Sequence, residues 1–175
     1  MEVKSSGYES FQRVYKEVFP VIMRVAYHVT YNVDAAEDIC QEAFIRFYNR
    51  ELTFPSVDEA KYWLIRVAKN LSINYVKRKG REQAAFDKIK RQPLPAMRTG
   101  EEQVLGNETR EVVQRAIEKL PEKLRTVLIL KEYGDLNYRE IGDILHITES
   151  NVKVRAHRAR LQLMKLIDQE DIHVS

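Results

Sequence analysis

The side chains of this sequence that are best suited to chemistry form a cluster of lysines and arginines that contains no acidic residue. Residues 150–165 hold five lysines and arginines and neither aspartate nor glutamate. Such a cluster suits a polyanion such as a nucleic acid, because cations bind phosphates while polar groups beside them hydrogen-bond to base edges. The alternative is a basic amphipathic helix that only covers a hydrophobic core.

A helix that starts at Ser150 and runs to about Asp168 would sort these residues into two sides, at about 100° per residue. The apolar side holds Val152, Ala156, Ala159, Leu163 and Leu166. The opposite side holds Ser150, Asn151, Val154, His157 and Arg158, flanked by Lys153, Arg155 and Arg160. A short predicted helix over 138–146 precedes it, with small Gly142 at the expected crossing and Ile147 filling the turn. This pattern is typical of a helix-turn-helix DNA-binding motif.

Charge alternates along the chain, although the whole chain carries only +3. Residues 1–60 carry −4, residues 61–100 carry +9, residues 101–149 carry −4 and residues 150–175 carry +2. Two separate basic segments predict two contacts with a polyanion, and the acidic segments predict a different, basic partner. The alternative is that each block is a solvated surface.

Other kinds of site find little support. The one cysteine, Cys40, lies among apolar helix residues, so we expect a buried inert thiol. The four histidines lack metal-ligand spacing, and neither a nucleophile–base pair nor a glycine-rich phosphate loop is visible. We therefore predict no metal, no cofactor and no enzymatic activity. No apolar run suits membrane insertion, and the first residues lack a signal-peptide core, which predicts a cytoplasmic protein.

Hydrophobic periodicity predicts an all-α fold of two small helical domains joined by a flexible linker. The expected helices of the first domain span 8–31, with Pro20 kinking or splitting it, 34–48, with Asp34 as N-cap, and 59–79. Residues 49–58 are expected to form a loop, and no strand is expected. Residues 82–106 lose periodicity and contain Pro93 and Pro95, so they are expected to be the linker. The second domain, 107–175, is expected to contain further helices, ending in the helix-turn-helix.

Several segments, in this order, resemble the bacterial RNA polymerase sigma factors of the sigma-70 family. They are Asp34-Ala-Ala-Glu-Asp-Ile-Cys-Gln-Glu-Ala-Phe, Trp63-Leu-Ile-Arg-Val-Ala-Lys-Asn, Leu120-Pro-Glu-Lys-Leu-Arg, Leu136-Asn-Tyr-Arg-Glu-Ile-Gly and Asn151-Val-Lys-Val-Arg-Ala-His-Arg-Ala-Arg. The short, two-domain layout is similar to the extracytoplasmic-function (ECF) group. The resemblance covers roughly residues 8–81 and 107–167.

The resemblance implies that residues 1–81 bind core RNA polymerase and open the minus-10 promoter element. Asp38, Gln41 and Glu42 would dock on the clamp coiled coil of the polymerase. The loop before the third helix would capture a flipped base of the non-template strand. The DNA contacts implied on that helix are Arg66, Lys69, Asn70, Asn74, Lys77, Arg78 and Lys79. Trp63 is expected to fill the core.

The same resemblance implies that residues 107–175 read the minus-35 element in the major groove and meet the polymerase flap. The family's base-reading positions correspond to Lys153, Val154, His157 and Arg158, and its supporting contacts to Lys131, Tyr138 and Arg139. Val154 replaces a hydroxyl common in the family, which favours a thymine methyl. His146 stands where many members have a turn glycine. The linker would thread near the RNA exit path, and an anti-sigma factor is an implied partner.

Two other functions remain open from the sequence. One is a one-component regulator that binds an operator as a dimer without polymerase, although it leaves the 34–44 and 63–70 motifs unexplained. The other is a helical adaptor whose basic segments bind an acidic protein. The adaptor predicts no salt-sensitive DNA binding.

Overall fold

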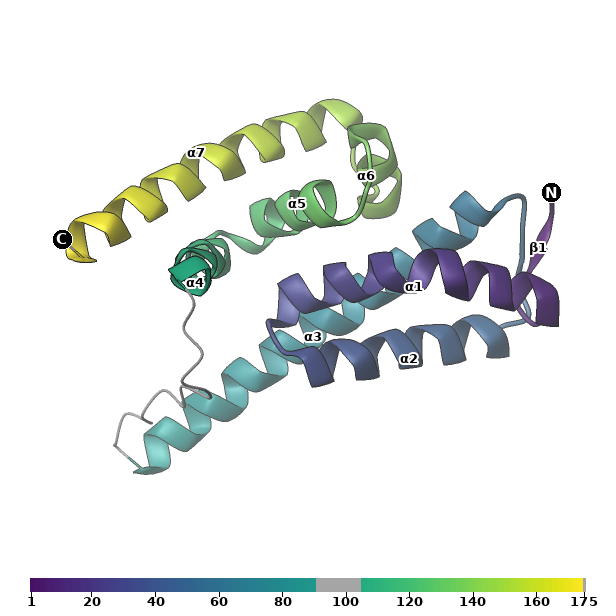
Figure 1. Ribbon diagram of the computed structural model, residues 1–175, viewed down its shortest axis with the longest axis horizontal. Coiled ribbons are helices and arrows are strands. Elements are labelled where there is room, and N and C mark those ends of the chain that lie inside the picture. Colours follow the sequence, from purple (N-terminus) through teal and green to yellow (C-terminus); the bar gives the residue numbers. More distant parts are fainter. Residues whose placement is uncertain (91–104, 175) are drawn as a thin grey trace.

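The computed structural model describes residues 1–90 and 105–174, which are almost entirely helical (Figure 1). The described elements are β1 (Val3–Lys4), α1 (Tyr8–Thr30), α2 (Val33–Asn49), β2 (Thr53–Phe54), α3 (Val57–Lys90), α4 (Leu105–Lys119), α5 (Glu122–Tyr133), α6 (Tyr138–Leu145) and α7 (Glu149–Val174). The first three helices form one bundle and the last four form another. This confirms the predicted all-α fold with a helix-turn-helix in the second half.

The first bundle is built around apolar stripes that α1, α2 and α3 turn toward one another. Phe47 is fully buried and lies between Phe54 and Trp63, at ring-centroid distances of 5.6 and 5.8 Å. Trp63 is half-buried and packs against this core, the role predicted for it. Pro20 lies inside one continuous helix, so the predicted split of α1 does not occur.

The start of α2 differs from the sequence prediction. Asn32, rather than Asp34, is the N-cap, and its side chain accepts a hydrogen bond of 2.9 Å from the backbone N–H of Ala35. Tyr31, just before it, has a left-handed backbone with φ of 51° and ends α1. Asp34 lies in the first turn of α2, where its charge still favours the helix N-terminus.

A short antiparallel pair of strands occupies part of the predicted loop. Val3 pairs with Phe54 and Lys4 with Thr53, so the chain start is tied to the segment before α3. Val3 is fully buried, and Ser5 accepts a 2.7 Å hydrogen bond from the backbone of Leu52. Strands of two residues leave no alternation for the sequence to display, which explains why they were not expected.

The predicted linker, residues 82–106, overlaps helices at both of its ends. Helix α3 continues through Lys90, and α4 already begins at Leu105. Local side-chain pairs support the added turns: Lys79 lies 3.4 Å from Glu82, and Gln83 donates a 2.9 Å bond to Asp87. The remaining predicted linker residues, 91–104, lie outside the described residues.

The second bundle is held by buried side chains of α5, α6 and α7, among them Leu130, Ile141, Ile144 and Val152. Pro121 immediately precedes α5, where its missing N–H costs no hydrogen bond. Glu170 of α7 lies 3.4 Å from Arg115 and 3.2 Å from Lys119 of α4. These pairs join the first helix of the bundle to its last.

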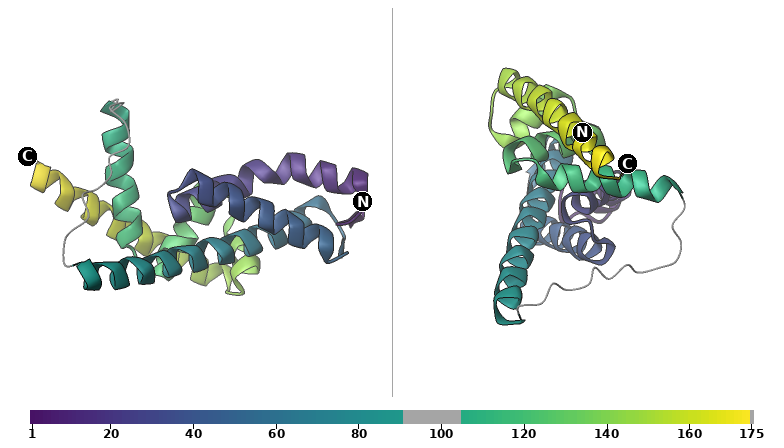
Figure 2. Two further views of the ribbon diagram at one scale, coloured as in Figure 1. Left: turned by 90° about the horizontal axis from the view of Figure 1, so that it is seen from below. Right: turned by 90° about the vertical axis from the view of Figure 1, so that its left-hand side faces the viewer.

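The two bundles lie against each other. Helix α5 packs on α1 and helix α6 packs on α3, and the buried apolar side chains form one continuous cluster through both contacts. The far halves of α3 and α4 project away from this contact at a steep angle to each other (Figure 2). The contact involves the middle of α3, and one cation nearer its basic end, Lys77, also reaches the second bundle, where it lies 3.3 Å from Glu122 of α5.

Candidate nucleic-acid interface

The helix-turn-helix has a closely fitted turn. Asn137 and Glu140 form a complete capping box at the start of α6. His146 ends α6 with a left-handed φ of 57°, a conformation that histidine tolerates better than most residues. A Cβ added at Gly142 would lie only 2.7 Å from the carbonyl oxygen of Ile147. Gly142 is therefore required by the close approach of the turn itself.

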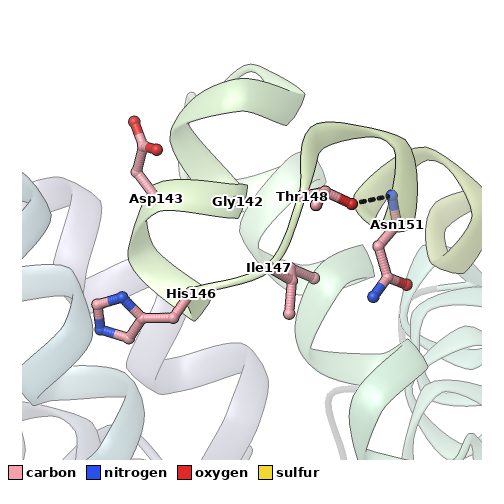
Figure 3. A pocket seen from close by; sticks show the side chains of 6 residues that line it. All are labelled: Gly142, Asp143, His146, Ile147, Thr148 and Asn151. Carbon is pink, nitrogen blue, oxygen red and sulfur yellow. Dashed lines mark hydrogen bonds between the residues drawn. The ribbon is translucent and has the colours of Figure 1, made fainter.

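Helix α7 begins one residue earlier than predicted. Thr148 accepts a 3.1 Å hydrogen bond from the backbone N–H of Asn151, as Figure 3 shows, and so caps α7. Gly142, Asp143, His146, Ile147, Thr148 and Asn151 line an open hollow of about 540 Å³ beside the turn. Ile147 is half-buried and packs against the core, as its predicted role in filling the turn requires.

The predicted recognition side of α7 is exposed. We use this name for Ser150, Asn151, Val154, His157 and Arg158, all of which face solvent. Val152, Ala156 and Ala159 on the opposite side are buried. Lys153 is exposed and lies 3.6 Å from Glu149, whereas Arg155 is half-buried. The structure thus brings the recognition side together on one accessible surface that can enter a DNA groove.

The predicted supporting residues join α5 and α6 to α7. Lys131 donates to the carbonyl of Leu136 at 3.2 Å, and its ammonium lies 5.0 Å from the centre of the Tyr138 ring. Tyr138 in turn accepts a 3.3 Å hydrogen bond from Arg160, which also lies 3.7 Å from Glu132. Arg139 is exposed without such a role. These contacts connect Lys131 and Tyr138 to Arg160, in the middle of α7.

The basic end of α3 forms a second exposed surface. Asn70, Asn74, Lys77, Arg78 and Lys79 are all exposed. The guanidinium of Arg78 and the ammonium of Lys79 each lie 5.7 Å from the centre of the Tyr75 ring. An aromatic ring beside two cations suits a single strand, whose bases stack while its phosphates pair with the charges.

Arg66 and Lys69 do not join this surface. The guanidinium of Arg66 donates to the carbonyls of Ile144 and Asp143, at 3.0 and 3.2 Å. Lys69 is half-buried beside it, and burial together with the Arg66 charge lowers the pKa of Lys69. Both predicted DNA contacts therefore lie at the contact between the bundles.

The acidic surface of α2 borders the basic end of α3. Asp38 and Glu42 share a groove of about 530 Å³ with Asn74, Arg78 and Arg81 of α3. Glu42 also pairs with Arg46 at 2.9 Å. Gln41 is exposed in a separate, largely aromatic hollow lined by Phe11, Tyr15, Phe44 and Tyr48. The three predicted polymerase residues thus lie on two neighbouring concave surfaces.

Sequence reasoning missed Arg81 and the polar residues between the bundles. Arg81 is separated from the basic run only by Gly80, so extending the helical pattern past residue 79 would have included it among the predicted contacts. Arg24 pairs with Asp135 at 2.8 Å, and Tyr62 donates to Glu140. These pairs join segments more than 75 positions apart, and no local pattern reports such a contact.

Three further observations concern the thiol, membrane insertion and metal binding. Cys40 is buried, as expected, and burial, with the nearby charge of Glu37, raises the pKa of its thiol to about 12. Within the described part of the chain, no helix has the length and apolar character needed to span a bilayer. The same residues contain no cluster of three or more potential metal ligands of the His, Cys, Asp and Glu types.

Comparison with known proteins matches both bundles to one family. Residues 14–82 match Sigma-70 region 2, and residues 110–163 match Sigma-70, region 4. The ECF RNA polymerase sigma factor SigW of Bacillus subtilis is 34% identical over 181 residues, which cover 94% of this chain and 92% of that protein. The ECF RNA polymerase sigma-E factor of Escherichia coli K12 is 36% identical over 132 residues, covering 70% and 69% of the two chains.

Solved structures with the same fold have lower sequence identity. The sigma factor RpoE of Bartonella quintana, solved with the anti-sigma factor NepR, aligns with a TM-score of 0.67 and 21% identity, over 91% of this chain and 98% of that one. CnrH, solved with the cytosolic domain of CnrY, aligns with a TM-score of 0.65 and 17% identity, over 94% and 92%. Both regions match in order, and the similarity extends along nearly the whole chain, which supports a sigma factor and not a one-component regulator. The chain belongs to the ECF sigma factors of the sigma-70 family.

Proposed function

We propose that α7 reads the minus-35 promoter element through its recognition side. The observation that carries this proposal is the exposure of Asn151, Val154, His157 and Arg158 opposite a buried apolar stripe. Arg158 suits a bidentate contact to guanine, and Val154 suits a thymine methyl. Lys153 and Arg155 flank these groups as phosphate contacts, and Ser150 lies at the helix start. Lys131, Tyr138 and Arg139 support the docking from α5 and α6.

The minus-10 element is proposed to bind along α3. Asn70, Asn74, Lys77, Arg78 and Lys79 supply amide groups and charge. Arg66 and Lys69, which lie at the contact with the second bundle, would add to this surface only where that contact is open. The segment before α3, which includes β2, would hold a flipped base of the non-template strand. The exposed cations around Tyr75 support this role because they suit a single strand.

Core RNA polymerase is proposed to bind the exposed surface of α2 through Asp38, Gln41 and Glu42. A basic helix of the polymerase clamp would complement this acidic surface, which borders the groove shared with α3. The second bundle would meet the polymerase flap. Since the two solved neighbours are complexes with NepR and with part of CnrY, we also propose an anti-sigma factor as a partner.

The protein is proposed to act as an initiation factor rather than as an enzyme, in the bacterial cytoplasm and at the nucleoid when bound to polymerase. Its work would be binding alone, and no step of the proposed function requires a cofactor or a metal.

In vitro transcription tests the proposal. Purified core polymerase is combined with this protein and fragmented genomic DNA, and the transcript starts are sequenced. We expect discrete starts that require this protein and share two spaced upstream elements. An absence of protein-dependent starts with polymerase from the native host would contradict it.

A further inference from the structure

The connecting segment, residues 50–56, joins α2 to α3, and each of its ends is fixed by the adjoining helix. The backbone N–H of Glu51 donates to the carbonyl of Tyr48 in α2 at 3.4 Å. The hydroxyl of Ser56 accepts a 3.3 Å hydrogen bond from the backbone N–H of Glu59 and so caps α3. The middle of the segment obtains its backbone partners from the start of the chain instead, which lies beside it in Figure 1.

Ser5 binds the backbone of Leu52 through two hydrogen bonds. The backbone N–H of Ser5 donates to the Leu52 carbonyl at 2.8 Å, and the Ser5 hydroxyl accepts from the Leu52 N–H at 2.7 Å. Ser5 is polar and yet fully buried, which these bonds permit. An unpaired backbone N–H in such a place costs as much as a lost hydrogen bond. The hydroxyl of Ser5 therefore stabilises this conformation of Leu52.

The pairing of β1 with β2 fixes which side chains of the connecting segment face solvent. Val3 is fully buried opposite Phe54, whose ring stacks on that of Phe47 at 5.6 Å. Lys4 lies opposite Thr53, and both are exposed. Because successive side chains of a strand point to opposite faces, a slip by one residue would exchange the two sets. The strand pair thus keeps Phe54 on the core and Thr53 outward.

The turn that leaves α2 also needs support from both sides. Glu51 has a left-handed backbone with φ of 50°, which is unfavourable for a residue other than glycine. Such a conformation persists where the surrounding structure holds it. Helix α2 holds Glu51 on one side, and the bonds between Ser5 and Leu52 hold it on the other.

We propose that residues 3–5 hold the connecting segment in its base-binding conformation, and that Ser5 is a positioning residue for the flipped base of the minus-10 element. The proposal rests on the function given above, in which this segment holds that base. Buried Ser5 acts through Leu52 and Thr53. A segment that is already ordered binds a base without the cost of ordering, whereas a mobile segment adapts to different bases and discriminates less between them.

The test compares Ser5→Ala with Ser6→Ala in the full chain. Ser5→Ala removes the hydroxyl and keeps the backbone bond to Leu52, and Ser6 is the exposed neighbour of the same type. Hydrogen exchange measures how firmly the connecting segment is held. Transcription with core polymerase measures base preference, from templates of a mapped start that carry each of the four bases at each minus-10 position in turn. The preference is the ratio of yields from the best and the worst base.

We expect Ser5→Ala to speed exchange in residues 50–54 while the buried parts of α1, α2 and α3 stay protected. The preference at one minus-10 position should fall about two- to tenfold, the range for loss of one hydrogen bond, and the preference at the other positions should stay constant. Ser6→Ala should change neither quantity. Faster exchange with an unchanged preference would overturn the positioning role. So would an equal loss of yield from all templates, because a merely structural role lowers every yield alike.

Lys4→Gly is a second variant that leaves every buried side chain of the strand pair in place. Glycine weakens a strand, so we expect the same preference to fall. Loss of the exposed Lys4 charge acts on all templates alike and leaves the ratio unchanged. If Ser5→Ala failed to fold, an unchanged ratio in Lys4→Gly would overturn the proposal.

A double variant, Thr53→Ala with Pro55→Ala, separates this inference from the function on which it rests. It removes two exposed side chains of the connecting segment and leaves Ser5 in place. If the double variant alters the preference and Ser5→Ala does not, the base-binding role stands and the positioning role is wrong. If the double variant leaves every preference unchanged, the segment does not hold the base, and both fail.

Discussion

The imidazole ring of His28 and the phenol ring of Tyr133 lie parallel within 8°, with their centroids 3.4 Å apart. This stacking joins the last turn of α1 to the last turn of α5. The Nδ1 atom of His28 is buried there without a hydrogen-bond partner among the described residues. A charged imidazole would be poorly solvated in this position, so the contact between the two bundles favours neutral His28.

Mild acid is therefore expected to separate the bundles. Burial lowers the pKa of His28 while the two bundles are in contact, and separation of the bundles returns this pKa toward its ordinary value of about 6.5. The stabilisation that neutral His28 gives to the contact between the bundles is present above this ordinary pKa. It is lost as the pH falls from there toward the lower pKa that His28 has while the bundles are in contact. The charged or titratable groups lining the same cavity are Tyr27 of α1, Tyr31 directly after it, Arg110 and Glu111 of α4, and Tyr133 of α5.

Small-angle scattering across this pH range measures the expansion. His28→Phe keeps an aromatic ring for stacking but cannot titrate, so the variant should stay compact in mild acid. Equal expansion of the wild type and His28→Phe would assign the effect to other groups.

Arg158→Ala is expected to weaken promoter use through the minus-35 element by about 1–3 kcal/mol, the range for a bidentate base contact. The measurement is transcription from paired templates with an intact or a scrambled upstream element. Lys123→Ala removes an exposed cation of α5 in the same bundle and serves as the control. If Arg158→Ala lowered transcription equally from both templates, Arg158 would not read this element.

Gln41→Ala combined with Glu42→Lys is expected to reduce affinity for core polymerase about tenfold or more, as loss of central interface residues does. The Lys side chain would also meet Arg46, the present partner of Glu42, and add repulsion. Glu17→Lys makes the same charge change at an exposed position of α1. Fluorescence titration gives the affinities and circular dichroism checks the fold. Unchanged affinity in a folded double variant would remove α2 from the polymerase interface.

Gly142→Ala is expected to destabilise the second bundle by about 1–3 kcal/mol, because the new methyl group would overlap the rigid backbone at Ile147. Gly80→Ala offers a contrast, since nothing lies within 4 Å of a Cβ at that helical position. That change should stabilise α3 by roughly 0.5–1 kcal/mol. Thermal unfolding of both variants measures the difference, and equal midpoints would contradict the close approach at Gly142.

Local patterns predicted the elements because side-chain periodicity and capping act over a few residues. The recognition side of α7, the turn at Ile147, the left-handed His146 and the buried Cys40 all follow from such patterns. Asp34 is not the N-cap because Asn32, two residues earlier, has an equally suitable side chain and the extended backbone typical of an N-cap. The turns of α3 beyond Lys79 depend on weak side-chain pairs that hydrophobic periodicity does not record.

The position of Arg66 shows what a linear pattern cannot contain. Its type and helix face predicted a contact with a phosphate oxygen of DNA. In the structure its guanidinium instead binds the carbonyl oxygens of Ile144 and Asp143, which lie 78 and 77 positions away in the sequence and come near only because the two bundles meet. The roles of the proposed polymerase and DNA residues likewise stay predictions until they are measured.

Glu170 has a mechanical consequence for α7. It is fixed between Arg115 and Lys119, whereas the recognition side lies in the first turns of the same helix. A helix advances about 1.5 Å per residue, so these two ends are roughly 20 Å apart. The first turns of α7 are held separately, because Val152, Ala156 and Ala159 are buried against α5 and α6. Helix α7 is therefore anchored near both ends, and its tilt within the bundle is fixed by residues on both sides of the exposed surface. If this surface enters a DNA groove as proposed, the same two anchors set the angle of approach.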